Sequence, residues 1–594
     1  MKVKLYVLTA SMLLAGCAST APPSTPQKSY QLDRPVQPLE QSLPRNLNTG
    51  TNRTAEIVSA QRITEILQRA HLRPIAVDAQ LSQHMLNGLI AGLDPQRIFF
   101  TDQDVSEFRS KNVHFAEEFA SGGITRLIQN TRELLSIKQN RYEYAKSLLK
   151  QPSKVSLKAP SRDSSQSISQ NYLIAYWKYK SQQDLAVIED LPYKHPLTVL
   201  QQRYQYQIDK IANLSDFDVF EILAHHYVVA YDPASNYYPA RFHTSLIGMG
   251  EEAYGVGLKV GSGAKITDVY LSSPAANAGI EAGDELLAIA QSDFDYQDII
   301  GRDPLDILSL LNGALGTKVR LLFEEKTGEI KQVELTRKNI KQQAISVESL
   351  KFPDMTQRVA VLKISSFPVD VAQQVASELA GINANEIRGL IIDLRGNEGG
   401  SLREATKLAA LFLPDAEVFQ IRSQTNRVNV ERTESTHSLS FEKDIIILTD
   451  AKTAGSAELF AAAMQEHGRA ILVGHTSYGM GLVKMARKLK RIYDVKDFEF
   501  GTLQYSVGQL YRLNGDSFQF KGVKPDILIA NQPTKPTPLA NAVAWDKIPS
   551  RDISKVRDLS EKVQKLRRDF HNEISTAEIN GDSLLKLSAE MLNK

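Results

Sequence analysis

Cysteine is almost absent from this sequence, since Cys17 is the only one among 594 residues. A single thiol excludes an intrachain disulfide, and the 11 histidines form no cluster with metal-ligand spacing. Neither sign of charge is in excess, because 70 basic residues balance 68 acidic ones. Nothing therefore points to nucleic acid or another polyanion as a partner. We expect no metal and no other cofactor.

Long apolar runs are also lacking after the first residues, so no later segment is expected to span a bilayer. The first 17 residues differ, because two lysines precede an apolar run that ends in Leu14-Ala15-Gly16-Cys17. This is the pattern of an export signal. Its ending resembles a bacterial lipobox, which favours a lipidated Cys17. An ordinary cleaved signal and a buried thiol are the alternatives.

Residues 18–52 are rich in Pro, Ser, Thr, Gln and Asn, which predicts a flexible linker. By analogy with lipoprotein sorting, Ala18-Ser19 lacks an aspartate retention signal, and this favours the outer membrane over the inner one. The N-terminus therefore predicts a protein of the bacterial periplasm that is held at the membrane by a lipid anchor.

The stretch from 445 to 484 carries the clearest pattern in the chain. The apolar residues 445–448 predict a short buried strand. Ser456 opens a helix-forming segment, with Glu458 in the first turn, where a negative charge suits the helix dipole. A second strand at 470–473 leads into a glycine loop at 474–481. A turn from a strand into a helix is a place where serine hydrolases expose their nucleophile.

These residues resemble the tail-specific proteases, or carboxyl-terminal processing peptidases, which are serine-lysine peptidases with a PDZ domain. The resemblance rests on the order of motifs. They are Ala-Glu-Leu-Phe-Ala-Ala-Ala-Met-Gln at 457–465, Gly468-Arg469-Ala470, Gly474, and the Gly-x-Gly of Gly479 and Gly481.

The catalytic residues that the resemblance implies are missing. Anchoring the family's glutamate on Glu458 places its nucleophilic serine at Gly455. The general-base lysine falls on Met480, whose thioether cannot accept a proton, and an assisting glutamine falls on Lys484. Three substitutions on three roles predict a pseudoprotease with no intact catalytic residue.

Ser456 is the fallback nucleophile, because its hydroxyl is one residue from the lost position. A shift of one residue at a helix start turns the side chain by about 100°, so we interpret Ser456 as a helix cap. A relocated dyad would need a new base. Four residues could be proposed for that role: Lys452, Lys484, His467 and His475.

Residues 55–245 predict a helical N-terminal domain. Apolar residues recur at three- and four-residue spacing in 57–67, 81–93, 115–135 and 219–229, and a polar loop interrupts them at 152–169. Leu93-Asp94-Pro95 and Tyr231-Asp232-Pro233 match signatures of the tail-specific protease N-terminal domain, which extends the resemblance beyond the catalytic-type region.

Residues 252–335 read as a PDZ domain. The resemblance rests on the motifs at 273–280 and 282–287 and on the glycine turn at 255–257. Such a turn lets backbone N–H groups converge on a terminal carboxylate, while an exposed strand edge pairs with the peptide. Leu308, on a helix predicted at 305–311, is expected to face the last peptide residue. The other peptide-binding candidates are Tyr254, Gly255, Val256, Gly257 and Leu258. A PDZ domain kept only as a spacer is the alternative.

Residues 340–535 predict a mixed α/β protease-like core of the ClpP/crotonase type, with strands at 359–366 and 389–395 and a helix at 371–379 between them. The motif at 393–400 resembles the family's oxyanion loop. Glu398 replaces a glycine there, and a carboxylate near an oxyanion site would oppose that charge. Gly399 and Gly400 are expected to keep a binding role.

Residues 539–594 predict a short helical tail, clearest at 556–570, so the fold class is multidomain α+β.

The favoured function is a pseudoprotease that binds C-terminal tails or unfolded polypeptide and regulates proteolysis, with an envelope protease or adaptor lipoprotein as partner. Two alternatives stay open. One is an active periplasmic serine endopeptidase using Ser456, which recognises C-terminal tails, and the other is a scaffold without peptide binding.

Overall fold

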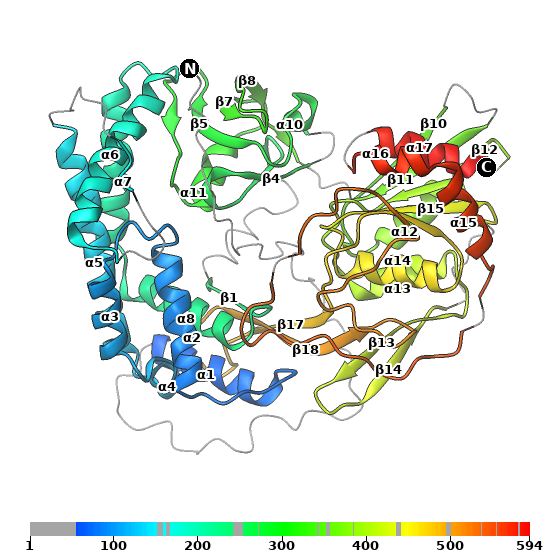
Figure 1. Cartoon of the computed structure of the whole chain (residues 1–594), viewed down its shortest axis with the longest axis horizontal. Helices are drawn as coiled ribbons and strands as arrows, with labels where there is room; N and C mark the ends of the chain where they lie inside the picture. The colour runs from blue at the N-terminus through cyan, green and yellow to red at the C-terminus, as the bar shows by residue number, and fades with distance from the viewer. Residues whose placement is uncertain are drawn as a thin grey trace.

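The computed structural model describes most of the chain from Ala55 to Lys594. Cys17, the predicted signal at 1–17 and the predicted linker at 18–52 lie outside the described residues. Figure 1 shows a helical domain and an α/β core at opposite ends, joined by a long ribbon of two strands, with a small middle domain beside the helices. The described ranges are 55–150, 158–161, 167–240, 254–270, 273–340, 344–351, 357–383, 385–434, 441–494, 500–535, 537–553, 555–579 and 582–594.

The N-terminal domain is helical, as the spacing of apolar residues predicted. The stretch 115–135 is not one helix, however, because Gly122 adopts a φ of 91° and ends α4 before α5 begins. The predicted boundary at 245 and part of the loop at 152–169 fall outside the described residues. The helices are α1 (Ala55–Ala70), α2 (Ala79–Leu93), α3 (Asp102–Lys111), α4 (Phe115–Ser121), α5 (Ile124–Leu148), α6 (Gln170–Glu189), α7 (Pro196–Ala212) and α8 (Asp216–Tyr231).

Large aromatic side chains hold these helices together. Phe119 of α4 stacks on Tyr227 of α8 with ring centroids 4.3 Å apart, and Trp177 of α6 is fully buried against Phe99. The motif Leu93-Asp94-Pro95 has a structural function, since the Asp94 carboxylate accepts hydrogen bonds from the main-chain N–H groups of 98–100. These side chains belong to one apolar core, which extends to Leu287, Leu322, Leu503 and Tyr505 of later segments.

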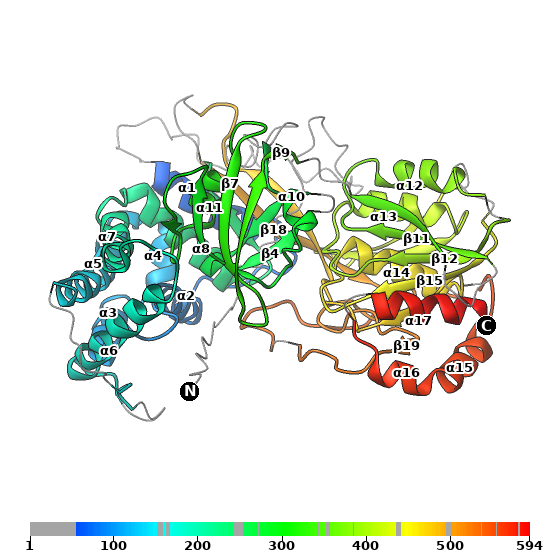
Figure 2. The same ribbon diagram turned by 90° about the horizontal axis from the view of Figure 1, so that it is seen from above.

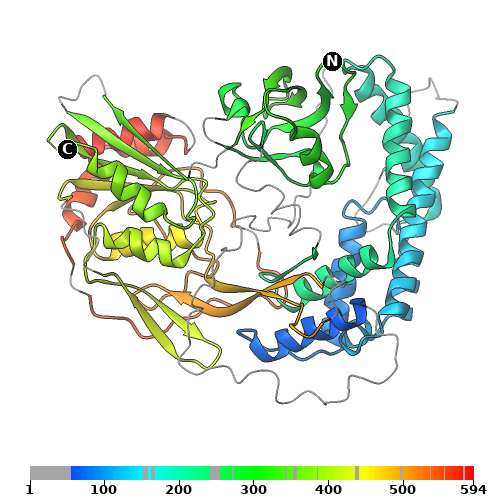
Figure 3. The ribbon, with the colours of Figure 1, turned by 180° about the vertical axis from the view of Figure 1, so that it is seen from behind.

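The middle domain has its own apolar core around a four-stranded antiparallel sheet, in the order β6-β5-β7-β8. This domain lies beside the long helices of the N-terminal domain (Figure 3). Arg203 of α7 makes a bidentate ion pair with Asp298 of the middle domain, at 2.7 and 2.9 Å. The elements are β2 (Tyr254–Gly255), β3 (Leu258–Val260), η2 (Ser262–Ala264), β4 (Ile266–Val269), α10 (Pro274–Asn277), β5 (Glu285–Gln291), β6 (Gln297–Asp298), α11 (Pro304–Leu311), β7 (Lys318–Glu324), β8 (Ile330–Thr336) and β9 (Lys338–Asn339).

The core is a six-stranded sheet in the order β10-β11-β12-β15-β16-β19, in which only β10 runs antiparallel to its neighbour. The mixed α/β organisation is as predicted. Helices α12, α13 and α14 cover one face (Figure 2). The elements are β10 (Ile345–Leu350), β11 (Arg358–Ile364), α12 (Val371–Ala380), β12 (Ile387–Asp393), α13 (Leu402–Ala410), β15 (Asp444–Thr449), α14 (Ser456–Glu466), β16 (Ile471–Gly474) and β19 (Ile527–Leu528).

A second, antiparallel sheet links the core to the helical domain. Its longest strand, β18, pairs with β17 along the ribbon, with β13 at one end and with β1 of the helical domain at the other. The link is thus built from main-chain hydrogen bonds as well as side chains. The strands are β1 (Asn236–Tyr238), β13 (Glu417–Ser423), β14 (Val428–Arg432), β17 (Leu482–Lys488) and β18 (Thr502–Tyr511).

The C-terminal residues form the third layer of the core. Phe570, Leu587 and Met591 pack on the sheet face opposite α14 (Figure 2). The prediction of a helix over 556–570 was wrong at its start, since α15 begins at Ser560 and the described residues from 539 to 559 are irregular. No helix among the described residues is long and apolar enough to cross a membrane. The helices are α15 (Ser560–Asp569), α16 (His571–Thr576) and α17 (Asp582–Asn593).

Candidate functional site

The turn between β15 and α14 is the centre of the candidate site. Gly455 ends this turn with φ 55° and ψ −120°, a conformation that strains any residue with a side chain. Sharp strand-to-helix turns of this kind hold exposed nucleophiles in serine hydrolases. Here the position carries no side chain.

Gly455 faces Met480 of the glycine loop. A Cβ atom added at Gly455 would lie 3.8 Å from the Met480 sulfur and 3.6 Å from the main-chain oxygen of Glu398. The predicted nucleophile and base positions therefore lie against each other and beside the predicted oxyanion loop. Gly455 has no side chain that could attack a carbonyl carbon, and the thioether of Met480 cannot accept a proton.

Ser456 does not cap the helix, and that prediction was wrong. The N-cap is Gly455, so Ser456 is the first helical residue. Its side chain is buried, and the hydroxyl donates a hydrogen bond of 2.9 Å to the main-chain oxygen of Gly400. The hydroxyl thus joins the start of α14 to the 397–400 loop.

The four proposed replacement bases are not bonded to Ser456. The Nε2 atoms of His467 and His475 lie 2.7 Å and 3.0 Å from the main-chain oxygens of Glu417 and Ala530. Lys452 is exposed. Lys484 lies half-buried on β17 opposite Ser506, and its side chain makes no hydrogen bond or ion pair with any described residue. Gly455 and Met480 therefore lie next to each other, but none of the four candidate bases is bonded to Ser456.

Glu458 is the residue that organises the site, and the sequence suggested only a role in the helix dipole. Its fully buried carboxylate accepts hydrogen bonds from the N–H groups of Gly455 (3.0 Å), Gly479 (2.7 Å) and Met480 (2.8 Å). The Ser477 hydroxyl donates a fourth, at 2.5 Å. Burial raises the pKa of the Glu458 carboxyl, while these donors act in the opposite direction. The carboxylate fastens the glycine loop to the start of α14.

Asn397 shapes the predicted oxyanion loop and was also missed. Its side-chain oxygen accepts from the N–H of Gly399 at 2.8 Å, and its amide donates to Ile364 O at 2.8 Å. The Gly399 N–H is therefore occupied. The main-chain N–H groups of Gly400 and Ser456 have no acceptor within the described part of the chain. Glu398 is exposed.

Glycine is required at position 399. It has a φ of 98°, and an added Cβ would lie 2.8 Å from Ala454 O and 2.9 Å from Ser456 N. A side chain would therefore collide with the turn that holds Gly455. Gly400 and Ser456 each bring one open backbone N–H group to this part of the turn, and backbone N–H groups are the donors that stabilise an oxyanion in acyl-transfer enzymes.

A lysine from a distant segment also reaches the glycine loop. The Lys535 ammonium donates to the main-chain oxygens of Tyr478 (3.3 Å), Phe520 (3.0 Å) and Lys521 (2.7 Å). Burial lowers its pKa. Three carbonyl acceptors bind the protonated form, so Lys535 serves here as a clamp on the loop. No pattern near position 535 indicated this contact.

The predicted peptide groove lies between β3 and α11, which pack against each other. β3 pairs with β4, and its other edge has no strand partner among the residues that the structure describes. Tyr254 and Gly255 form β2 and pair with β9. The N–H groups of Val256 and Gly257 have no acceptor in the described ranges.

Two of the predicted peptide-binding leucines lie on the two elements that flank this groove. Leu258 is buried at the start of β3, and Leu308 is half-buried on α11. Gly257 has a φ of 83°, and its Cβ position lies 2.2 Å from the Ser273 Cβ, so only glycine fits this turn. No group of three or more His, Cys, Asp or Glu residues that could hold a metal ion occurs among the described residues.

Two family models match the chain. The tail-specific protease N-terminal domain matches residues 63–241, and peptidase family S41 matches residues 358–529. The tail-specific protease of Haemophilus influenzae is 27% identical over 521 residues, which are 85% of this chain and 75% of the relative. The carboxy-terminal processing protease CtpA of Bacillus subtilis is 26% identical over 256 residues, which are 43% of this chain and 51% of that relative.

Solved structures give weaker similarities. The photosystem II D1 C-terminal processing protease is 17% identical with a TM-score of 0.41, and the match covers 58% of this chain and 90% of that one. A peptide-bound PDZ domain of the carboxy-terminal protease from Vibrio cholerae is 25% identical with a TM-score of 0.14, covering 15% of this chain and 98% of that one. The two family models and the Haemophilus relative agree with the fold and with the motif order. The chain therefore carries a tail-specific protease N-terminal domain and a peptidase family S41 domain, and it is homologous to the Haemophilus tail-specific protease.

Proposed function

We propose that this protein is a pseudoprotease that binds peptide segments and does not cleave them. The contact between Gly455 and Met480 carries the proposal, since 3.8 Å separates the Met480 sulfur from the place where a nucleophile's Cβ would stand. In a serine-lysine peptidase these two positions must supply a hydroxyl and an amine. Lys484, where the family has an assisting glutamine, is the third substitution.

The contacts of Ser456 support the same proposal. A nucleophilic hydroxyl needs a base that accepts its proton, whereas the Ser456 hydroxyl donates to the Gly400 carbonyl and is buried. The open donors of Gly400 and Ser456 are compatible with holding a peptide carbonyl. An active endopeptidase using Ser456 would have to break the hydrogen bond to Gly400 and recruit a base.

We further propose that the middle domain is a PDZ domain that takes C-terminal tails. Support comes from the unpaired edge of β3 and from the open N–H groups of Val256 and Gly257, which suit an added strand and its terminal carboxylate. Leu308 and Leu258 would contact an apolar last side chain. A scaffold without peptide binding would not need these features.

The proposed place of action is the periplasmic side of the outer membrane, with a lipid on Cys17 and residues 18–52 as a tether. Its support is the pattern Leu14-Ala15-Gly16-Cys17 and the composition of the following residues. From there the protein would present unfolded or C-terminal segments to an envelope protease or an adaptor lipoprotein, and so regulate proteolysis. Mass spectrometry of the mature N-terminus tests the lipid.

Tail binding is tested with two peptides that have the same apolar C-terminal sequence, one with a free carboxylate and one amidated. The proposal expects the full-length chain to bind the free acid more tightly, and Leu308→Asp to remove this difference. Leu315→Asp is the matched control, because Leu315 is 60% exposed in the same domain. Equal binding of acid and amide, or no binding at all, would favour the scaffold.

A further inference from the structure

We propose that the open edge of β10 is a second docking site, independent of the middle domain, for an extended polypeptide segment that carries a lysine or arginine. This site lies in the core, at the edge of the six-stranded sheet. It uses main-chain groups of β10 and acidic and amide side chains of α12.

The register of β10 leaves three residues facing outward. Ala344 accepts a hydrogen bond from the Ser365 N–H at 2.8 Å, so the even-numbered residues of β10 exchange hydrogen bonds with β11. The N–H and C=O groups of Ile345, Val347 and Ser349 therefore point away from the sheet. None of them has a hydrogen-bond partner among the described residues.

The opposite edge of the same sheet is closed in the way that proteins normally protect edges. β19 has two residues, and the N–H groups that follow it are bonded, Ile529 to Gly474 O and Ala530 to Ile574 O. β10, by contrast, has six residues and neither proline nor lysine. Its one charged residue, Glu348, alternates with Val347 and so lies on the far face of the sheet.

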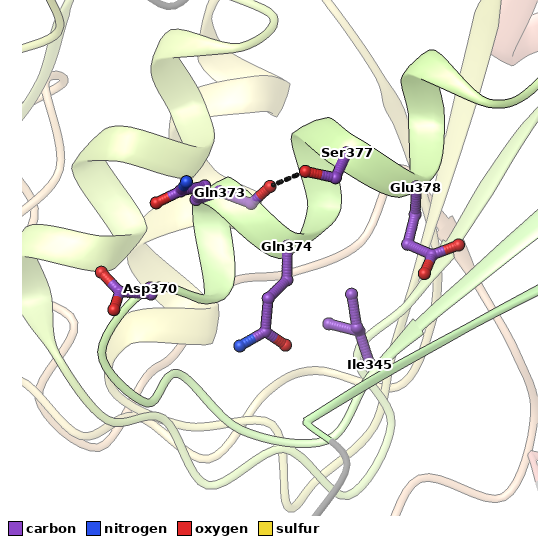
Figure 4. A pocket seen from close by; sticks show the side chains of 6 residues that line it. All are labelled: Ile345, Asp370, Gln373, Gln374, Ser377 and Glu378. Atoms are coloured by element: carbon purple, nitrogen blue, oxygen red, sulfur yellow. Dashed lines mark hydrogen bonds between the residues drawn. The ribbon is translucent and has the colours of Figure 1, made fainter.

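A cavity of about 390 Å³ lies directly beside this edge. Ile345 forms its floor, and one face of α12 forms its rim (Figure 4). The side chains of Gln374 and Glu378 extend from α12 to the side on which Ile345 lies. Every second side chain of a strand added to β10 would lie on the α12 side of the sheet, and the one next to Ile345 would face this cavity.

The carboxylate and amide groups around the cavity favour a peptide with a basic side chain. Asp370, at the N-cap of α12, and Glu378, near the end of the helix, are both exposed, and neither forms an ion pair with a described residue. The polar groups between them are Gln373, Gln374 and Ser377. Two free carboxylates with amide neighbours attract an ammonium or guanidinium group. A second copy of this chain fits less well, because pairing β10 with itself would bring two acidic α12 faces together.

The test uses acetylated and amidated peptides of alternating valine and threonine, with one central lysine or one central glutamate. The blocked C-terminus keeps these probes out of a carboxylate-binding groove, so failure of this proposal is separate from failure of tail binding. Hydrogen exchange of the full-length chain is followed by mass spectrometry over residues 344–350. We expect the lysine peptide to slow exchange there, and the glutamate peptide to bind roughly two- to fivefold more weakly.

Two pairs of variants distinguish pairing with the β10 edge from nonspecific peptide binding. Ser349→Pro removes an outward N–H and blocks the edge, whereas Ser349→Thr keeps that N–H. Glu378→Lys should reverse the preference between the two peptides, while Glu348→Lys, on the far face, should leave it unchanged. Unfolding curves of all variants report whether the fold is kept.

Three results would overturn the proposal. The first is the absence of protection at 344–350 at millimolar peptide. The second is an equal effect of Glu348→Lys and Glu378→Lys. The third is protection of this edge that rises with protein concentration when no peptide is present, which would assign the edge to a second copy of the chain.

Discussion

The Asp232 carboxylate lies 3.0 Å from Nε2 of His71, and both side chains are buried where the helical domain meets β18. The same oxygen accepts hydrogen bonds from the Ser235 and Ser506 hydroxyls, each at 2.7 Å. Ser506 belongs to β18, and its main-chain oxygen accepts from the N–H of Leu72 at 2.7 Å. One buried carboxylate thus joins β18 to the helices, in addition to the main-chain pairing of β1 with β18.

This carboxylate should make the junction sensitive to acid. Burial raises the pKa of Asp232, but hydrogen bonds from His71 and its other donors outweigh burial and lower it from 3.8 to about 2. A lowered pKa means that the stabilisation, about 2 kcal/mol, is present above pH 3.8 and is lost as the pH falls through about 2. Urea unfolding of wild type and Asp232→Asn should differ at pH 6 and converge near pH 2.

Asp268→Asn is the control for this experiment, because its side chain is 54% exposed in an ion pair with Lys259. It should change the free energy of unfolding by less than about 1 kcal/mol. A difference between wild type and Asp232→Asn that is the same at both pH values would contradict the assignment.

Gly399→Ala should distort the candidate site. Its Cβ would lie within 3 Å of Ala454 O and Ser456 N, at a φ of 98°, so we expect a loss of about 2 kcal/mol or more in stability. Gly396→Ala is a matched control with a φ of 73° and nothing within 4 Å. Thermal unfolding compares the two. If both variants lost the same stability, backbone strain alone would explain the glycine at 399.

Much of the local structure around this site was predictable, because apolar periodicity and glycine positions encode it. The strand, helix and strand between 445 and 473 were predicted from their β-branched, apolar and helix-forming residues. Contacts between segments far apart in the chain could not be predicted from the residue pattern. Met480 could be placed opposite Gly455 only through the family resemblance, and the pairing of β1 with β18 joins residues more than 260 positions apart.

The wrong predictions have local causes. Ser456 resembles a cap in sequence, but the glycine before it takes the cap position, which frees the serine hydroxyl for Gly400. The amphipathic pattern at 556–570 extends past the helix because the residues before Ser560 are irregular, and the Val556 N–H donates to the main-chain oxygen of His467, at the end of α14. The contact of Lys535 was not predicted because its partners are main-chain carbonyls, which every residue has and which the sequence therefore does not indicate.

Glu458→Gln should weaken the link between the glycine loop and α14. All four partners of the carboxylate are donors, so the amide nitrogen of glutamine would face donors and leave some of them unsatisfied. We expect a loss of about 1–3 kcal/mol in the free energy of unfolding and faster hydrogen exchange at 477–481. Glu398→Gln, at an exposed position in the same site, should change neither quantity.

Returning serine and lysine to the facing positions tests the geometry of the site. In Gly455→Ser/Met480→Lys a hydroxyl and an amine would again stand against each other beside the donors of Gly400 and Ser456. We expect this double variant to cleave an unfolded substrate above the wild-type background, with Gly455→Ser alone and Met480→Lys alone as controls. Equal activity in the single and double variants would show that the two positions do not act as a pair.

The most direct measurement is the mass-spectrometric search for cleavage products after the wild-type chain is incubated with an unfolded protein that ends in an apolar tail. Ser456→Ala is treated in parallel, and binding of the tail is followed in the same samples. We predict retained binding and no product from either protein. Products from the wild type that disappear in Ser456→Ala would contradict the pseudoprotease and identify Ser456 as a relocated nucleophile.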